Sequence, residues 1–93
     1  MFIAILTLQL HLEGCFSLKE KRGRIGGLRD KFGRSPSVAV CESGEQDQHQ
    51  QAEYIFTVVG LDKGQIKSQI SAVINHCNGG IDAVLADHKI EWL

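Results

Sequence analysis

The first segment of the chain is apolar at every second position, and this alternation constrains the fold more than any other feature. The alternating residues are Phe2, Ala4, Leu6, Leu8, Leu10 and Leu12. Because successive side chains of a β-strand point to opposite faces, the pattern predicts a long strand with one face buried. The intervening residues change from apolar Ile3 and Ile5 to polar Gln9 and His11. We therefore expect this strand to lie in the centre of its sheet.

Two later segments carry helical signals. Ser17 and Glu20 have the spacing of a capping box, and an apolar residue recurs at helical spacing up to Gly33, which predicts one amphipathic helix over residues 17–32. A second helix is predicted to begin at Asp62 and to end at Asn78-Gly79-Gly80. Its apolar stripe consists of Ile66, Ile70, Val73, Ile74 and Cys77.

Three shorter segments complete the predicted order of elements. Strands are expected at residues 37–41, at residues 52–58 and, less regularly, at residues 81–92, with a polar, Gln-rich loop over residues 43–51. The order is β-α-β-β-α-β, two split βαβ units in tandem. Right-handed crossovers then predict an α+β, ferredoxin-like sandwich, in which a four-stranded antiparallel sheet carries two helices on one face. An alternative arrangement has the last strand paired with another chain.

Length and composition restrict the class of protein. A chain of 93 residues is the size of one domain, which we expect to span residues 1–93. Cys15, Cys41 and Cys77 lie far apart, so neither a disulfide framework nor a zinc site is indicated. No apolar run approaches the roughly 18 residues of a membrane-spanning segment. We predict a cytoplasmic protein that uses no membrane and no cofactor.

Positive charge is concentrated in one segment. Residues 17–34 contain seven basic and two acidic residues, whereas the rest of the chain contains three basic and nine acidic residues. One basic helix on an acidic body favours a contact with a polyanion, although basic side chains also extend to solvent around a buried stripe. The leading hypothesis is a non-enzymatic RNA- or ribosome-associated binding module. Its candidate contact residues are Lys19, Lys21, Arg22, Arg24, Arg29 and Lys31.

Lys21 differs from its basic neighbours because helical spacing places it inside the apolar arc. Glu42 and Asp47 are within its reach, so we predict an ion pair there. A small ligand-binding site or an enzyme that uses Lys21, Glu42 and Asp47 is the alternative hypothesis. His49 and the acidic residues near it match no metal-ligand spacing, and no nucleophilic motif is present, so we predict no metal and, on balance, no enzyme.

The face of the sheet that lacks helices is expected to be apolar at one end. The residues assigned to its apolar part are Ile3, Ile5, Ala39, Cys41, Ile55 and Val59. A contiguous exposed apolar surface indicates an interaction site, which predicts a homodimer through this open face. A structural dimer that regulates a protein partner is the third hypothesis. Tyr54 and Phe56 have the parity of the core, which argues against a base-stacking platform on the open face.

The capped segment also carries a family resemblance. Ser17-Leu18-Lys19-Glu20-Lys21-Arg22, after an alternating strand, closely resembles the YlxP-like family, domain of unknown function 503. The resemblance continues at Val40, Glu42, Gln46-Asp47, Gln50 and Ala52. Gly44 and Glu45 stand where that family has an acidic residue followed by histidine. The resemblance implies a ferredoxin-like fold, a cytoplasmic setting and a suspected link to the ribosome or translation factors, without an established activity.

Overall fold

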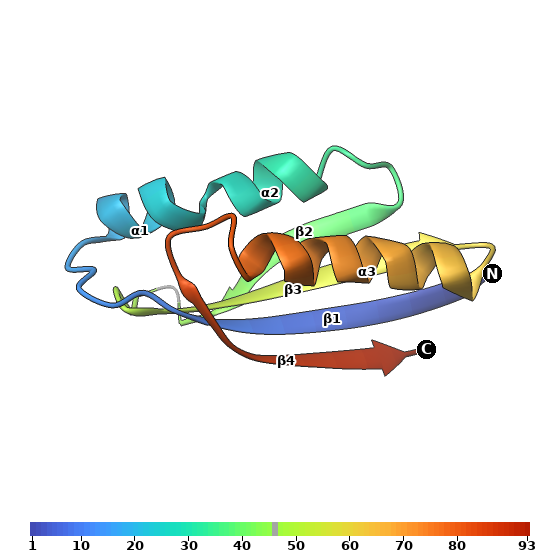
Figure 1. The fold of residues 1–93 in the computed structure, drawn as a ribbon. Helices are drawn as coiled ribbons and strands as arrows, with labels where there is room; N and C mark the ends of the chain where they lie inside the picture. Colours follow the sequence, from blue (N-terminus) through green and yellow to red (C-terminus); the bar gives the residue numbers. More distant parts are fainter. Residues whose placement is uncertain (46) are drawn as a thin grey trace.

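A computed structural model of the chain describes residues 1–45 and 47–93, and these form a sheet with a helical layer on one side (Figure 1). Gln46, part of the Gln-Asp pair named above, lies outside the described residues. The elements in chain order are β1 (Phe2–His11), α1 (Leu18–Ile25), α2 (Gly27–Phe32), β2 (Val38–Gly44), β3 (Gln51–Gly60), α3 (Lys63–Cys77) and β4 (Val84–Trp92).

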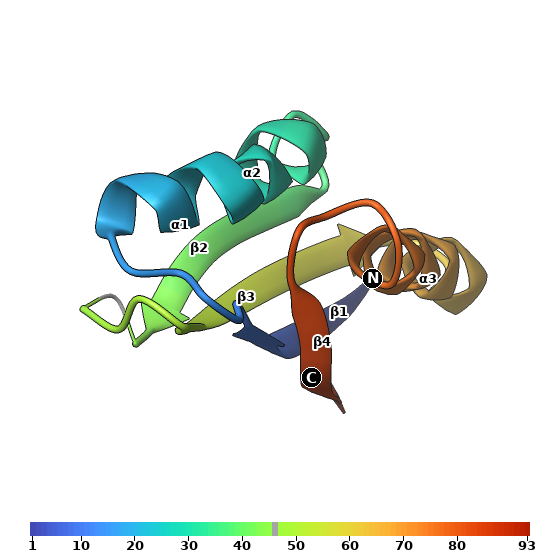
Figure 2. The ribbon, with the colours of Figure 1, turned by 60° about the vertical axis from the view of Figure 1, so that its left-hand side comes forward.

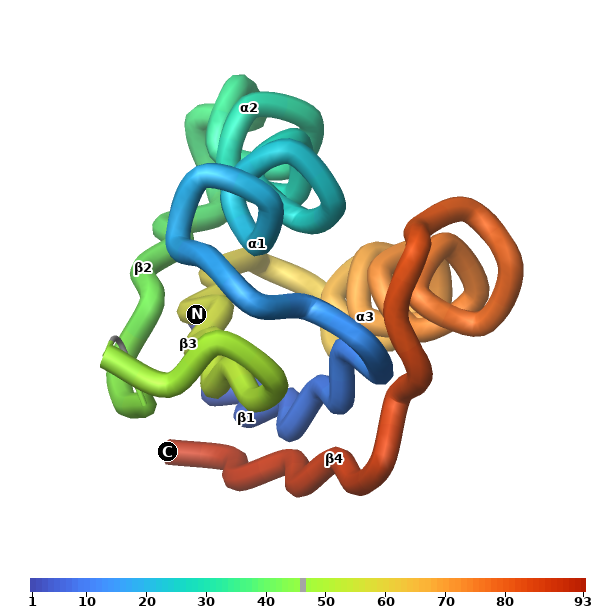
Figure 3. Tube along the Cα trace, turned by 90° about the vertical axis from the view of Figure 1, so that its left-hand side faces the viewer, coloured from blue at the N-terminus to red at the C-terminus, as the bar shows by residue number. Residues whose placement is uncertain are grey.

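The sheet has the predicted topology. Its strand order is β2-β3-β1-β4, and all three neighbouring pairs are antiparallel, so β1 and β3 are central and β2 and β4 are the edges. Viewed along the strands, α1, α2 and α3 lie on the same side of this sheet (Figure 3). The α+β, ferredoxin-like architecture expected from the order of elements is therefore confirmed.

The core lies between the sheet and the helices and follows the sequence periodicity. Leu6 of β1 and Phe56 of β3 are register partners, and both are fully buried. Across from them, α3 buries the predicted stripe except Ile74, which is partly buried. Tyr54 and Phe56 point into this layer, as their parity predicted. The open face of the sheet carries Ile3, Ile5 and Ile55 as predicted.

The expectation of one helix over residues 17–32 is wrong, because the segment is divided at Gly26 into α1 and α2 (Figure 1). The Gly26 N–H still donates to the Arg22 carbonyl oxygen at 2.8 Å, so the chain continues in nearly the same direction. A Cβ at Gly26 would stand 2.5 Å from that same oxygen. Glycine is therefore required at this close approach.

The ends of two strands also differ from expectation. β2 extends to Gly44, so Ser43 and Gly44 belong to a strand rather than to the Gln-rich loop. β4 begins at Val84 instead of Ile81 and contains an irregularity opposite Gln9 and Leu10. β4 pairs with β1 of the same chain, so the arrangement with an exchanged last strand is not the one observed.

The helical layer covers β4 only sparsely, through Lys63 of α3, whose Nζ lies 5.5 Å from the centre of the Trp92 ring. α1 and α2 run along β2, and α3 packs against β3 and β1 (Figure 2). The side chains of β4 are consequently exposed, apart from the partly buried Leu85. No helix in residues 1–45 and 47–93 is long and apolar enough to cross a membrane.

Candidate functional site

Lys21 forms the ion pair that its position in the sequence predicted. Lys21 and Ile25 are the two buried residues of α1, and Lys21 is only 3% exposed. Its Nζ lies 3.1 Å from Oε2 of Glu42 on β2. Burying an ammonium group is unfavourable unless its charge and its N–H donors are satisfied. The ion pair supplies the charge partner.

Two backbone carbonyls satisfy the rest of the ammonium group. Nζ of Lys21 donates to the carbonyl oxygens of Glu45 and Gln48, both at 2.8 Å. An ammonium group has three N–H donors, and Lys21 uses two of them for these carbonyls, while the Glu42 carboxylate balances its charge. Glu45 has a positive φ of 61°, an unusual backbone conformation for a residue with a Cβ. Lys21 therefore acts as a clamp that joins α1 to the turn between β2 and β3.

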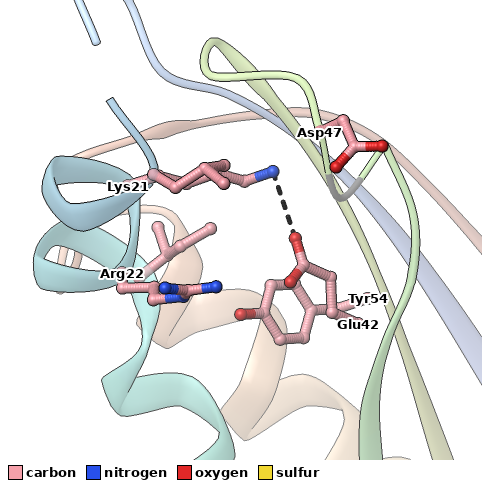
Figure 4. Close-up of a pocket in the computed structure, with 7 residues that line it drawn as sticks. Lys21, Arg22, Glu42, Asp47 and Tyr54 are labelled. Carbon is pink, nitrogen blue, oxygen red and sulfur yellow. Dashed lines mark ion pairs between the residues drawn. The ribbon is translucent and has the colours of Figure 1, made fainter. Parts of the chain in front are cut away.

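A pocket of about 310 Å³ lies beside this clamp, between α1 and the sheet. Lys21 and Arg22 reach into it from α1, Glu42 and Tyr54 from the sheet, and Asp47 from the turn between β2 and β3 (Figure 4). Leu18 and Ile25 complete the lining. The structure thus brings together Lys21, Glu42 and Asp47, the three residues of the alternative ligand site. Asp47 lines the pocket and is exposed.

Tyr54 is a member of this pocket that the sequence reasoning assigned only to the core. Burial raises the pKa of its phenol, and the negative charge of Glu42 raises it further, whereas Arg29 acts in the opposite direction. The hydroxyl therefore stays protonated and can donate a hydrogen bond at neutral pH. The residue type could have predicted this position, because a tyrosine among core residues has a hydroxyl that needs a hydrogen-bond partner or solvent.

Arg24 is held by the rest of the molecule. Its guanidinium lies 3.0 Å from Oε1 of Glu20 and 3.5 Å from Oδ2 of Asp82, and it donates to the carbonyl oxygen of Glu13 at 2.8 Å. The contacts with Glu13 and Asp82 connect α1 to the turn that follows β1 and to the segment that precedes β4. Two of the six predicted contact residues, Lys21 and Arg24, therefore have acidic partners within the chain.

The other four predicted contact residues project outward. Within the described residues, no carboxylate forms an ion pair with any of these exposed side chains, which we call the outer cations. They are Lys19, Arg22, Arg29 and Lys31. Arg22 lines the pocket beside the clamp, and Arg29 lines a shallow hollow against Val38 and Val40 of β2. The outer cations thus include two arginines along the β2 edge.

The described part of the chain holds no group of three or more His, Cys, Asp and Glu side chains that could bind a metal ion. His49 is exposed in the turn between β2 and β3. Cys15, Cys41 and Cys77 are free thiols. Burial raises the pKa of Cys77 to about 11, so that thiol is protonated at neutral pH.

Comparison with known families agrees with the motif that carries the ion pair. Residues 3–90 match the family described as "Protein of unknown function (DUF503)", a span that includes the capped helix, the clamp and most of each of the four strands. The chain belongs to the DUF503 family. No curated protein matches this DUF503 chain.

Solved structures similar to this DUF503 protein share its fold at low sequence identity. A de novo designed protein, Foldit4, is 10% identical, with a TM-score of 0.59 over 100% of this chain and 97% of the design. SnoaB, a cofactor-independent oxygenase from Streptomyces nogalater, is 11% identical, with a TM-score of 0.53 over 98% of this chain and 90% of that protein. At these identities the likeness establishes the fold alone.

Proposed function

We propose that this DUF503 protein is a non-enzymatic module that binds RNA, free or within a ribosomal assembly, through the outer cations of α1 and α2. One observation carries the proposal. Lys21 and Arg24 are neutralised inside the molecule, whereas Lys19, Arg22, Arg29 and Lys31 have no carboxylate partner among the described residues. Basic groups without partners that gather on one element of an acidic protein favour contact with phosphates.

The position of the outer cations suits a phosphate backbone better than a base-reading surface. Arg22 and Arg29 lie along the β2 edge, next to two hollows of about 310 and 480 Å³. Arginine can donate two parallel hydrogen bonds to a phosphate. The aromatic residues Tyr54 and Phe56 are buried under the helices, so the open face offers no stacking platform from β3. We therefore propose recognition of backbone and shape, without reading of sequence.

A small anionic ligand in the pocket beside the clamp is the second candidate function. The polar lining of the pocket and the protonated hydroxyl of Tyr54 next to Arg22 favour it. Lys21 itself is a weak candidate for a ligand anchor or a catalytic group, because its ammonium group already donates to two backbone carbonyls and forms an ion pair with Glu42. In this alternative, Arg22 and Tyr54 hold the ligand, while Lys21, Glu42 and Asp47 shape the pocket.

The test is a fluorescence-anisotropy titration of the protein with a structured RNA hairpin at several salt concentrations. Replacing both Arg22→Gln and Arg29→Gln is expected to weaken binding and to lower the slope of log K against log salt by roughly two. The matched control replaces two exposed lysines of α3, Lys63→Gln and Lys67→Gln, which removes the same charge from the other helix. This control should bind RNA nearly as well as the unmodified protein.

Three results would count against the proposal in different ways. If the unmodified protein shows no RNA affinity at low salt, RNA binding is wrong. If the control and the arginine variant lose affinity equally, the contact is not made by α1 and α2. If free phosphate compounds raise the melting temperature, and Arg22→Gln alone abolishes that effect, the small-ligand alternative replaces the RNA hypothesis.

A further inference from the structure

β4 is an edge strand that presents apolar side chains on the side of the sheet that carries the helices. Ile90 and Trp92 are 40% and 39% exposed, and Phe2, in the neighbouring strand, is 36% exposed. Ile90 and Trp92 are the register partners of the buried residues Leu6 and Ala4 of β1, so their side chains lie on the same face of the sheet. α3 packs mainly against β3 and β1, and Nζ of Lys63 at its N-terminal end lies 5.5 Å from the centre of the Trp92 ring, so this side of β4 is only partly covered. An exposed strand edge with apolar residues is a site for pairing with another strand.

The backbone of β4 has a defined set of outward-facing groups. The N–H of Leu93 donates to the carbonyl oxygen of Ile3 at 2.9 Å, which directs the backbone groups of Leu93 toward β1. In an antiparallel ladder these groups alternate in direction from residue to residue. The N–H and C=O groups of His88, Ile90 and Trp92 therefore point away from β1. No other strand lies beside β4 among the described residues.

We propose that β4 pairs antiparallel with β4 of a second copy of this chain, about a two-fold axis at Ile90. In this register Ile90 faces Ile90 of the second copy, and His88 faces Trp92. These are the residues with outward backbone groups, so each facing pair can exchange backbone hydrogen bonds. On the open face, Lys89 then lies opposite Glu91 of the second copy, and the two-fold axis creates this attractive pair twice.

Neighbouring registers do not combine opposite charges across the axis with regular backbone pairing. An axis at Lys89 sets Lys89 opposite Lys89 and Asp87 opposite Glu91 of the second copy, so that like charges face each other. An axis at His88 brings the irregularity between Leu85 and Asp87 into the pairing. An axis at Ile90 uses only the regular stretch from Asp87 onward. Within one chain Lys89 and Glu91 already contact each other at 2.8 Å, so both side chains lie on the same face of β4.

The other edge of the sheet is a poor site for the same kind of pairing. β2 is bordered by Arg22, Arg29 and Arg34, which line the hollows along it. Two copies meeting at β2 would bring these positive charges together, and charged residues at an edge protect it from strand addition. Self-association at β4 leaves the outer cations of both copies accessible, so it is independent of the proposed RNA contact.

Charge reversal tests the proposed register. Lys89→Glu places two pairs of like charges across the axis, and we expect the dimer dissociation constant in sedimentation velocity to rise at least about tenfold. The double variant Lys89→Glu with Glu91→Lys restores opposite charges across the axis and should restore association. Thermal unfolding of each variant separates a loss of dimer from a loss of fold. A double variant that folds but does not associate would overturn the register.

A crosslink tests the axis itself. Cross-strand Cα atoms of a hydrogen-bonded pair lie about 5.5 Å apart, a distance that a disulfide spans. In a Cys41→Ser background, Ile90→Cys should therefore form a covalent dimer with a mild thiol oxidant such as diamide, whereas Val84→Cys, also exposed on β4, should not. Equal crosslinking of both variants, or of neither, contradicts the proposal.

The open face of the sheet is the rival surface for a second copy, as predicted from the sequence. Ile55→Lys, in the middle of that face, should leave β4 pairing intact. If Ile55→Lys abolishes association while Lys89→Glu does not, the second copy binds the open face and the proposal for β4 is wrong. A single monomeric species at every concentration, up to hundreds of micromolar, would exclude both.

Discussion

α3 and the α1–α2 segment cover the same sheet with different chemistry. α3 is one uninterrupted helix of 15 residues, capped by Asp62, whose side chain accepts from the N–H of Gly64 at 2.7 Å. The residues that it buries are Ile66, Ile70, Val73 and Cys77. None of these four buried residues is charged. This half of the molecule is stabilised in the ordinary way, by burial of apolar surface.

The α1–α2 segment buries a charged residue where α3 buries an aliphatic one. Lys21 is as inaccessible as Ile70, at 3% exposure for each. The segment is also divided at Gly26 and contains Gly23 and Gly27, which weaken a helix. Burial of an ion pair seldom adds stability over an apolar pair of similar size. What the clamp provides is position, because it fixes the turn that carries Glu45 and Gln48 beside Arg22 and the pocket.

The charged and polar features that could bind a ligand are concentrated on one side of this molecule. A buried cation, a polar pocket and the outer cations all belong to the first helical segment and to β2. α3 contributes apolar packing against the sheet. If this division holds, substitutions in the α1–α2 segment should separate stability from binding, whereas substitutions in α3 should alter stability alone.

The largest effect is expected when the clamp is broken. Lys21→Met leaves Glu42 without its cation and the carbonyls of Glu45 and Gln48 without their donor, so the free energy of unfolding should fall by about 3 kcal/mol. The matched control Lys67→Met, on the exposed face of α3, should change it by less than about 0.5 kcal/mol. Urea denaturation measures both.

A second variant sharpens this prediction. Lys21→Met combined with Glu42→Leu removes both charges, and we expect it to recover most of the lost stability. If the single and double variants are equally unstable, the ion pair does not determine the loss, and the contacts with the turn carry it. If Lys21→Met is as stable as the unmodified protein, the view that Lys21 acts as a clamp is wrong.

Much of the fold follows from patterns that depend on local spacing. The alternation from Phe2 to Leu12 and the stripe of α3 each specify one buried face, and together with the order of elements they lead to the observed sheet. The division at Gly26 was not predicted, because three nearby glycines lower helix propensity without showing which of them interrupts the helix. The exposure of β4 was also missed, since it depends on how far α3 reaches across the sheet.

The candidate site could be predicted only in part. The position of Lys21 inside an apolar arc predicted its acidic partner, because a buried ammonium needs one. The carbonyls of Glu45 and Gln48 could not be predicted, since every residue has a carbonyl and the sequence does not show which one turns inward. The contact of Arg24 with Asp82 joins segments far apart in the chain, and it depends on the complete fold.

The glycines of the first helical segment provide a smaller test of the comparison. A Cβ at Gly23 or at Gly27 would meet no atom within 4 Å. Gly23→Ala should therefore raise the free energy of unfolding by about 0.5–1 kcal/mol, since alanine loses less conformational entropy in a helix. Gly26→Ala is the matched control and should lower it, because its Cβ would contact the Arg22 carbonyl.

The RNA titration gives this substitution a second use. If Gly23→Ala is more stable and binds RNA unchanged, the glycine is merely tolerated in a weak helix. If the variant is more stable but binds more weakly, the missing side chain is needed for close approach of a ligand backbone. A loss of stability would show that the open space at Gly23 does not accommodate a methyl group.

The smallest expected effect concerns the N-terminus of α1 and depends on pH. Glu20 accepts from the backbone N–H of Phe16 at 3.0 Å and also contacts Arg24, and these interactions lower the pKa of its carboxyl. A lowered pKa in the folded state means that the ionised group stabilises the fold. That contribution is complete above the ordinary pKa of about 4.5 and is lost as the pH falls through the folded-state value.

Amide exchange at the start of α1 measures this effect directly. Acidification from pH 6 toward pH 3 should lower the protection factors of the Phe16 and Glu20 amides, taken relative to the intrinsic exchange rate at each pH, because the capping interactions of Ser17 and Glu20 weaken together. The N-terminus of α3 has no acidic residue in its first turn, so the amides there depend on Asp62 alone. Glu20→Gln should remove most of the pH dependence at α1 and leave that of α3 unchanged. Equal acid sensitivity of the two helices in this variant would show that the difference between their N-termini does not originate at Glu20.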